Sequence, residues 1–456
     1  MENILLVIAT ILTIVIVARC ILKNYNSMFI FFATGILVFL GISIFTQTSV
    51  LGDSSTGNIF IDVFELVSSQ FKSSVGGIGA TLMAVTGYAM YMTHLKASNL
   101  LAGLATKPLA KLNKPYLVLG FIFVVGIFLK MTIPSHSGLS LLLMATAFPI
   151  VVNLGVSTKS AAAVMIACGA LDWGPNDGSA VYAAEEIVGI PVMEFFTKYQ
   201  VPMAAILILT LAITLSVYSK YMDKKEGLYM AETDRKEVED EKFDIPNIYA
   251  FLPLLPLALV TAFSFTDSIK MDVIAANMIG FAVAFACEII RTRDLKAVSQ
   301  SFMVPLEAMG NCLAKIVSII VAAGVFAEAV KALGGVQIIA NFLAGIQGIT
   351  LFTIAAMSLI TFGAVILLGS GNASWYAFAP LVPDIASRMG LEIASIAVPM
   401  HLATAIGRSL SPVAGVVIAV AGMAGLEGSD LIRRNVVPMV IAFIVNILAS
   451  YILFVI

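Results

Sequence analysis

Polar residues gather in four short stretches that interrupt long apolar runs. These stretches are SHSGLS at 135–140, LDWGPNDGS at 171–179, GSGNAS at 369–374 and GRSLSP at 407–412. Hydroxyl and amide side chains can hold a hydrophilic ligand at a smaller desolvation cost than a full charge, although each hydroxyl could instead only cap a helix end. We therefore expect one ligand-binding site here. Its predicted residues are Ser135, His136, Ser137, Asn176, Ser370, Gly371, Asn372, Ser374, Arg408, Ser409 and Ser411.

Charged residues in and near these stretches could take part in the same chemistry. Arg408 could hold a carboxylate through two parallel hydrogen bonds, or it could form a structural salt bridge. Asp172 could neutralise Arg408 or take part in coupling to a cation or a proton, and Asp177 competes for that coupling role. His136 could donate to an anion, titrate near neutral pH or be structural. Lys130 could pair with Asp172 or extend toward the membrane surface.

A small cation is the only cofactor that these residues indicate. The predicted coupling-ion residues are Asp172, Gly174, Asp177 and His136. The candidate sodium ligands are Ser135, Ser137 and Gly174 for one ion, and Ser370, Asn372 and Ser409 for another. A proton is the alternative. His401 is expected to pack against its neighbours, and the four cysteines show neither metal-binding nor redox spacing.

The composition indicates that the polar stretches lie inside a membrane. The chain has 456 residues, of which 60% are hydrophobic and 12% are charged, and its mean hydropathy is +1.00. Soluble domains carry about 25% charged residues, and several runs here reach the ~20 apolar residues that cross a bilayer. The net charge of −2 gives no indication of nucleic-acid binding. We expect an all-α polytopic membrane protein whose first run, 4–18, is a retained helix.

Basic loops predict the orientation of the chain, because Lys and Arg favour the cytoplasmic ends of membrane spans. Basic residues occur at 19–23, 96–114, 219–244, 291–296 and 433–434. If all of these segments are cytoplasmic, both termini lie on the outer side of the membrane. The longest of them, 219–244, then forms a solvated linker between two halves of the chain.

The two halves match one another at the polar stretches. In each half a Ser-containing stretch is followed by a proline, Pro149 or Pro383, and then by a second stretch with Pro175 or Pro412. The loop charges of the two halves differ, which predicts opposite orientations and therefore an inverted repeat, the common plan of secondary transporters. A polar break between two apolar arms predicts a re-entrant hairpin. Backbone N–H and C=O groups at its tip have no helical partners, so at membrane depth they must line a cavity or bind a ligand.

This pattern predicts about ten transmembrane helices, two re-entrant helical hairpins with tips at 135–140 and 369–374, and two broken helices. The predicted divisions are scaffold helices at 1–92, an interfacial arm, hairpin and broken helix at 93–218, a linker at 219–246, scaffold helices at 247–330, and a second arm, hairpin and broken helix with the final helix at 331–456.

Four longer stretches resemble the anaerobic C4-dicarboxylate carriers of the DcuC type. They are IPSHSGLSLLLMATAFPIVVNLGVS at 133–157, LDWGPNDG at 171–178, LLGSGNASWYAFAPLVP at 367–383 and HLATAIGRSLSPVAGVVIAVAGMAG at 401–425. The resemblance implies uptake, exchange or efflux of fumarate, succinate or malate across a bacterial inner membrane. The wider ion-transporter superfamily implies a homodimer, in which a transport domain of hairpins and broken helices moves like an elevator against a fixed scaffold.

The hairpin tips differ from those of the sodium-coupled divalent-anion members of that superfamily. Those members have Ser-Asn-Thr at both tips, whereas this chain has Ser135-His136-Ser137 and Ser370-Gly371-Asn372. The resemblance therefore supports substrate binding at the tips more strongly than it supports sodium coupling. Proton coupling and uncoupled exchange both stay open. The expected protein is a transporter and not an enzyme. The alternatives are a carrier of another organic anion or an amino acid, a cation/proton antiporter, and an intramembrane hydrolase with a serine near His136.

Overall fold

The computed structural model describes residues 2–23, 25–112, 114–228, 245–264, 271–335, 338 and 350–456. Their regular secondary structure is entirely helical, so the predicted all-α class is confirmed for this part of the chain. The helices long and apolar enough to cross a membrane are Ser27–Thr46, Ile59–His94, Val192–Lys225, Val273–Thr292, Leu295–Ala332, Thr350–Leu368 and Gly428–Phe454. The expected total of about ten spans stays a prediction, because several further apolar helices are shorter.

The first half of the chain folds into a set of long helices, then shorter, interrupted ones, and then the long helix α12. The long helices are α1 (Glu2–Leu22), α2 (Ser27–Thr46), α3 (Ile59–Ser74), the π-helical turn η2 (Val75–Gly79) and α4 (Ala80–His94). The later helices are α5 (Ala97–Thr106), α6 (Pro115–Lys130), α7 (His136–Thr146), α8 (Phe148–Asn153), α9 (Thr158–Ala167), α10 (Gly178–Tyr182) with its continuation η4 (Ala183–Val188), α11 (Val192–Phe195) and α12 (Val201–Lys225).

The second half repeats this order of long helices, hairpin and broken helix. Its first helices are η7 (Asn247–Leu254), α13 (Leu255–Ser264), α14 (Val273–Thr292), α15 (Leu295–Ser301), α16 (Met303–Cys312), the π-helical turn η8 (Leu313–Val317) and α17 (Ser318–Ala332). Its later helices are α19 (Thr350–Leu368), α20 (Gly371–Phe378), α21 (Val382–Arg388), α22 (Ile393–Arg408), α23 (Gly415–Ala424) and α24 (Gly428–Phe454). The opposite orientation of the two halves in the membrane stays a prediction.

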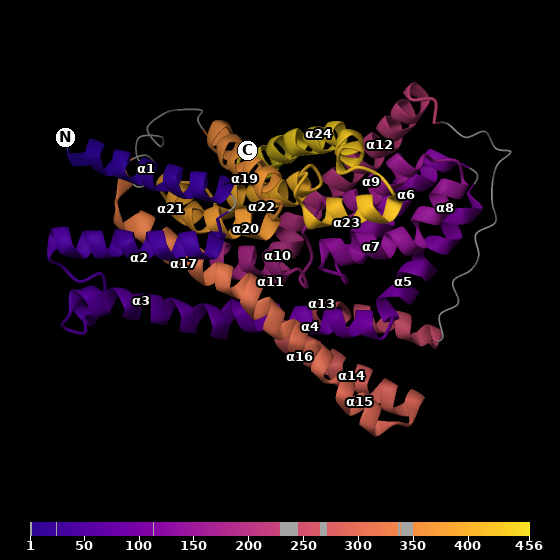
Figure 1. Cartoon of the computed structure of the whole chain (residues 1–456), viewed down its shortest axis with the longest axis horizontal. Coiled ribbons are helices and arrows are strands. Elements are labelled where there is room, and N and C mark those ends of the chain that lie inside the picture. Colours follow the sequence, from indigo (N-terminus) through magenta and orange to yellow (C-terminus); the bar gives the residue numbers. More distant parts are fainter. Residues whose placement is uncertain are drawn as a thin grey trace.

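The long helices form two rods that cross one another. Figure 1 shows α3 and α4 as one rod along the lower edge of the molecule, crossed by the rod of α16 and α17. The π-helical turns η2 and η8 lie in the middle of these rods and contact each other. The helices α16 and α17 pack on α4 and α2, whereas α12 packs on α24 and α19 packs on α22. The hairpins and broken helices therefore sit beside the crossed rods.

Both hairpins turn earlier than the sequence predicts. In the first hairpin, α6 ends at Lys130 and α7 begins at His136, so most of the segment 135–140 is the first turns of a helix. In the second hairpin, α19 is followed by Gly369, whose φ of +70° is accessible to glycine at little cost. A Cβ on Gly369 would lie 2.7 Å from a backbone oxygen of Val413, so this tip also requires a residue without a side chain.

The two predicted broken helices are present. The first runs as α9 to Ala167 and resumes at α10, and the second runs as α22 to Arg408 and resumes at α23. Pro175 and Pro412 lie inside the breaks, where their missing N–H removes no helical hydrogen bond. The proposed division of the chain into scaffold and transport segments stays a prediction, and residues 229–244 of the predicted linker lie outside the described part of the chain.

Candidate functional site

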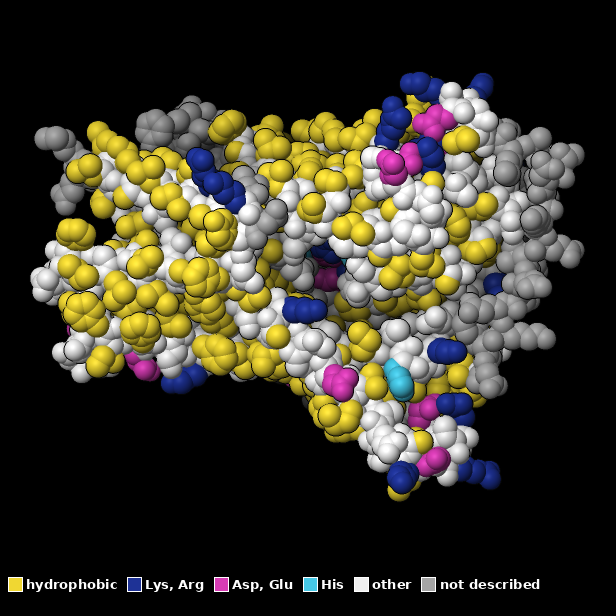
Figure 2. Space-filling view, viewed as in Figure 1, with side chains coloured by type: hydrophobic (Ala, Val, Ile, Leu, Met, Phe, Trp, Pro, Cys, Tyr) yellow, Lys and Arg dark blue, Asp and Glu magenta, His cyan; other side chains and the backbone are white. Residues whose placement is uncertain are grey.

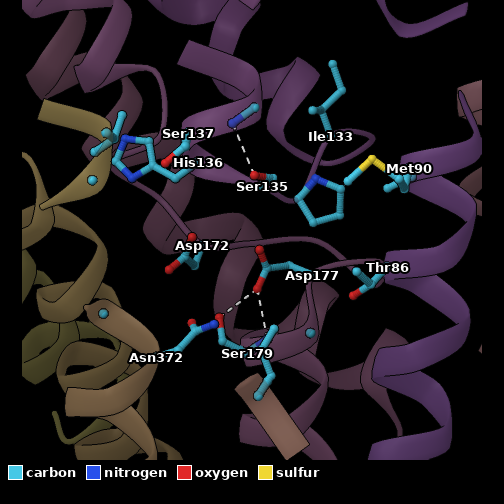
Figure 3. Close-up of a pocket in the computed structure, with 18 of the residues that line it drawn as sticks. Thr86, Met90, Ile133, Ser135, His136, Ser137, Asp172, Asp177, Ser179 and Asn372 are labelled. Atoms are coloured by element: carbon cyan, nitrogen blue, oxygen red, sulfur yellow. Dashed lines mark hydrogen bonds between the residues drawn. The ribbon is translucent and has the colours of Figure 1, made fainter. Parts of the chain in front are cut away.

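A cavity of about 730 Å³ lies where the two hairpin tips meet α4. Its lining includes residues 133–138 of the first tip and residues 369–372 of the second. Figure 3 shows Ser137 of the first tip and Asn372 of the second on opposite sides of Asp172. One largely apolar face of the molecule is hollowed near its centre, and basic and acidic side chains are visible in that hollow (Figure 2). The fold thus brings both polar tips to one cavity.

The cavity is surrounded by the N-termini of four helices. The first residues of α7, α10, α20 and α23 all belong to its lining. The N–H groups in the first turn of a helix have no partner inside the helix and carry partial positive charge. Ser135 and Ser370 accept only the N–H of the third helical residue, at 3.1 and 3.2 Å, so the earlier N–H groups of α7 and α20 are left for a ligand.

Two cations and two carboxylates form a buried network beside the cavity. The Lys130 ammonium donates to Asp177 Oδ2 at 2.7 Å and lies 3.0 Å from Asp172 Oδ1. The Arg408 guanidinium donates to the second oxygen of Asp172. The side chain of Lys130 has no solvent exposure and that of Arg408 is 13% exposed. The network therefore joins the first hairpin to the breaks of both halves, and it is electrically neutral.

Asp177 has a second role at the start of α10. Its Oδ1 accepts from the backbone N–H of Ser179 at 3.0 Å, from that of Ala180 at 3.2 Å and from the Ser179 hydroxyl at 2.6 Å. A carboxylate at this position caps the helix and interacts favourably with its dipole. Together with the Lys130 contact, these bonds engage both oxygens of Asp177. Figure 3 shows the bonds to Ser179 at the floor of the cavity.

Both histidines near the site have defined hydrogen-bond partners. His136 is 5% exposed, and its ring lies 2.8 Å from the carbonyl of Ile166 through Nε2 and 3.4 Å from Arg408 Nη1 through Nδ1. This arrangement suits a neutral imidazole whose Nε2–H donates and whose Nδ1 accepts. His401 Nε2 lies 2.9 Å from the Ser179 hydroxyl. Since that hydroxyl donates to Asp177, the pair lacks the serine-to-histidine donation of an activated nucleophile.

Five predicted site residues do not belong to the lining of this cavity. They are Gly174, Asn176, Ser374, Ser409 and Ser411. The Gly174 N–H donates to Gln200 at 3.0 Å, and Asn176 accepts from Asn277 of α14 at 3.3 Å.

The three serines differ in how their hydroxyls are satisfied. Ser374 donates to the carbonyl of Ser370 at 3.0 Å, which makes it a helix-internal residue. The hydroxyls of Ser409 and Ser411 are buried and form no hydrogen bond within the described part of the chain. Gly174 and Asn176 are thus satisfied by side chains of other segments, and Ser374 is satisfied by the backbone of its own helix. The second break retains two unsatisfied hydroxyls.

One wall of the cavity consists of residues that are not among the predicted site residues. Thr86, Met90 and Thr93 of α4 line it. Figure 3 shows Thr86 and Met90 on the opposite side of the view from Ser137 and Asn372. These residues are spaced i, i+4 and i+7, so they share one face of a helix. That spacing was the available signal, although two threonines and a methionine on one helical face are also common in ordinary packing. Asn99 of α5 adds a further polar side chain to the lining.

Comparisons with known proteins agree over almost the whole chain. Residues 5–455 match the family model DcuC, described as a C4-dicarboxylate anaerobic carrier. The anaerobic C4-dicarboxylate transporter DcuC of Escherichia coli O6:H1 is 33% identical over 442 residues, which cover 96% of this chain and 95% of that protein. The transporter of the same name from Shigella flexneri is 32% identical over 442 residues, with the same coverage.

A solved structure has a similar fold. The YdaH transporter of Alcanivorax borkumensis superposes with a TM-score of 0.63, and the match covers 93% of this chain and 97% of that one. Its sequence is only 13% identical, so the likeness concerns the fold alone. The match to the family model and the identity to the curated transporters concern the sequence itself, and they extend across both hairpins and both broken helices. The chain therefore belongs to the DcuC family of C4-dicarboxylate anaerobic carriers.

Proposed function

We propose that this chain is a secondary transporter of C4-dicarboxylates, such as succinate, fumarate or malate, in a bacterial inner membrane. The observation that carries the proposal is the convergence of four helix N-termini on one cavity lined by both hairpin tips. Family membership and the names of the E. coli and S. flexneri relatives support this substrate class. In this proposal the chain moves its substrate by uptake, exchange or efflux and catalyses no covalent reaction.

The charge of the site suits a dianion. Each helix N-terminus acts as roughly half a positive charge, so four of them together supply about two. The buried network of Lys130, Arg408, Asp172 and Asp177 is neutral overall, and its carboxylate Asp177 caps only α10, so α7, α20 and α23 keep a positive potential without a carboxylate cap. A C4-dicarboxylate has two negative charges near neutral pH and would balance it. The cavity of about 730 Å³ also lies within the usual ~300–1,000 Å³ of small-molecule sites.

Individual groups in the lining can bind the two carboxylates. The first N–H groups of α7 and α20, the Ser137 hydroxyl and the Asn372 amide are the proposed donors. Arg408 also lies in the lining, and its guanidinium is already held by Asp172. We propose that Arg408 contributes one full positive charge and a planar donor group at the edge of the site, with Asp172 fixing its orientation.

An elevator motion fits the composition of the cavity. One side of the lining comes from α4, in a long rod, and the other comes from hairpin tips and helix breaks. We propose that the hairpins and broken helices move as one body past the rods, and that the protein is a homodimer held by the scaffold helices. Both termini are proposed to face the periplasm, in agreement with the basic loops.

The proposed substrate class can be tested with purified protein in liposomes. Liposomes loaded with unlabelled succinate should take up labelled succinate, and external fumarate or malate should compete with the label. A monocarboxylate such as acetate, and a neutral amino acid, should compete much less, because neither supplies two carboxylates. Preferential competition by an amino acid would favour the alternative carrier. Cation/proton exchange with no uptake of any organic anion would favour the antiporter.

A further inference from the structure

A buried lysine occupies the space between the two carboxylates of the site. Lys130 is the last residue of α6, immediately before the first hairpin tip. Its ammonium contacts Asp172 at 3.0 Å and Asp177 at 2.7 Å, and the exposed fractions of the two carboxylate side chains are 4% and 5%. Buried ionisable groups in membrane proteins are expensive unless they are paired or used in ion coupling. Lys130 satisfies two carboxylates that would otherwise attract a cation from solution.

The first predicted set of sodium ligands does not fit a bound ion. Ser135 uses its hydroxyl to accept the N–H of Gly138 at 3.1 Å, and the carbonyl oxygen of Gly174 accepts the N–H of Asp177 at 3.1 Å. The negatively charged oxygens that could strengthen this set belong to Asp172 and Asp177. All four of these oxygens already contact a cation or an N–H or O–H donor.

The second predicted set fits no better. Ser370 accepts the N–H of Ala373 at 3.2 Å, and the buried hydroxyl of Ser409 contributes no negative charge. Ser409 directly follows Arg408, and the Arg408 guanidinium packs against Gly371, so that a Cβ on Gly371 would lie 2.7 Å from Arg408 Nε. A sodium ion at this tip would therefore be placed beside a guanidinium whose carboxylate partner, Asp172, is already shared with Lys130.

We propose that Lys130 is a built-in counter-cation that takes the place of a coupling sodium ion between Asp172 and Asp177. The inference rests on the proposed dicarboxylate transport and specifies its ion dependence. Because the ammonium is covalently attached to the hairpin, the cation travels with the site and is never released. Sodium then has no site to fill, and dicarboxylate exchange proceeds without it.

Transport and thermal stability test this proposal separately. Wild-type exchange of labelled succinate should be the same within about twofold in sodium chloride and in choline chloride. The melting temperature of the purified protein without substrate should also be the same in the two salts. A loss of exchange of about tenfold or more in choline, or a melting temperature that rises specifically with sodium, would overturn the proposal.

Substitution of the lysine makes the test specific. Lys130→Met keeps an unbranched side chain that is one heavy atom shorter and removes the charge, so Asp177 loses its cation and the melting temperature should fall and become sodium-sensitive. Lys130→Met/Asp177→Asn removes both charges, and its melting temperature should recover and lose the sodium response. The matched control is Lys159→Met, which also breaks a lysine–aspartate pair, with Asp430 at 2.6 Å, but at a site that is 31% exposed. The control should show no sodium response.

The outcomes distinguish this inference from the proposed function. Should Lys130→Met fail to fold, the double variant and the two wild-type measurements still decide the matter. A folded Lys130→Met variant that shows no sodium response and full exchange activity would contradict the role of Lys130. If wild-type protein carries no dicarboxylate in either salt, the proposed function fails, whereas the melting temperatures still report on whether sodium binds.

Discussion

Arg408 is the residue at which the proposed substrate binding and the internal charge balance meet. It lines the cavity and is paired with Asp172. We expect Arg408→Lys to retain partial dicarboxylate binding, because lysine keeps the charge and loses the planar donor group. Arg408→Ala should lose more, about 2–5 kcal/mol of binding free energy if the contact is desolvated. Calorimetric titration of folded, purified variants with succinate measures both effects.

The double variant Arg408→Ala/Asp172→Ala separates the two roles of the arginine. It removes the buried lone carboxylate that Arg408→Ala leaves behind, so thermal stability should recover relative to the single variant. Succinate affinity should stay low, because the positive charge at the substrate is still missing. Near-normal succinate affinity in the double variant would restrict Arg408 to a structural salt bridge.

Gly371 provides a steric test of the same guanidinium. A Cβ at this position would lie 2.7 Å from Arg408 Nε, closer than van der Waals contact allows. We expect Gly371→Ala to displace Arg408 from the tip and to lower succinate affinity by about tenfold. Gly363→Ala in α19 is the matched control, since a Cβ there meets no atom within 4 Å. Equal affinities in the two variants would show that the tip tolerates displacement of the arginine.

His136 is expected to be an orienting residue in the neutral state. Its ring bridges the Ile166 carbonyl and the Arg408 guanidinium, and Lys130 and Asp172 complete the charged groups around it. His136→Gln should therefore weaken transport through the position of Arg408 and leave the pH profile of exchange unchanged. A pH profile that flattens or shifts in this variant would instead indicate that His136 carries a coupled proton.

At the scale of elements, α4 forms a wall of the cavity that is separate from the hairpins. Met90→Trp should fill part of the cavity and reduce succinate exchange by about tenfold or more, while the melting temperature stays close to that of the wild type. Leu209→Trp is the control, because Leu209 of α12 is 63% exposed and lies outside the lining of the cavity. Unchanged exchange in Met90→Trp would mean that the substrate does not use the space beside α4.

The sequence predicted the breaks in the hairpins and broken helices more accurately than the residues that pack around these breaks. Glycine, proline and serine act on the local backbone, so both hairpins and both interruptions were visible from residue type alone. The hairpin turns were placed a few residues too late, because Ser135 and Ser370 are N-caps and the polar residues after them are already helical. The cavity face of α4 was missed, since a mixed polar and apolar helical face does not identify what packs against it.

The partners of the charged residues also depend on the tertiary structure. The possible pairing of Lys130 and Arg408 with Asp172 was foreseen, and the structure shows both contacts. The additional contact between Lys130 and Asp177 was not foreseen, because it requires the end of α6 to lie against the start of α10. Sequence spacing gives no information on which of two nearby aspartates an ammonium will bridge.

At the scale of the whole molecule, two halves of one chain supply complementary parts of one cavity and of the charged network beside it. The first half contributes Lys130, Asp172 and Asp177, and the second half contributes Arg408 and the second tip. Neither half alone has both the neutral network and the four helix N-termini. The two similar halves therefore contribute different residues to the cavity. Substitutions in either half should impair the same proposed substrate site.

The most direct test of this account is whether substrate protects both tips at once. Ser137→Cys and Asn372→Cys are made separately in a chain whose four native cysteines are replaced by serine. Saturating succinate should slow the reaction of both cysteines with a small thiol reagent by about tenfold. Acetate should protect neither, and Ser299→Cys on exposed α15 should react equally fast with and without succinate. Reaction rates at both tips that succinate leaves unchanged would contradict a dicarboxylate site between the hairpins.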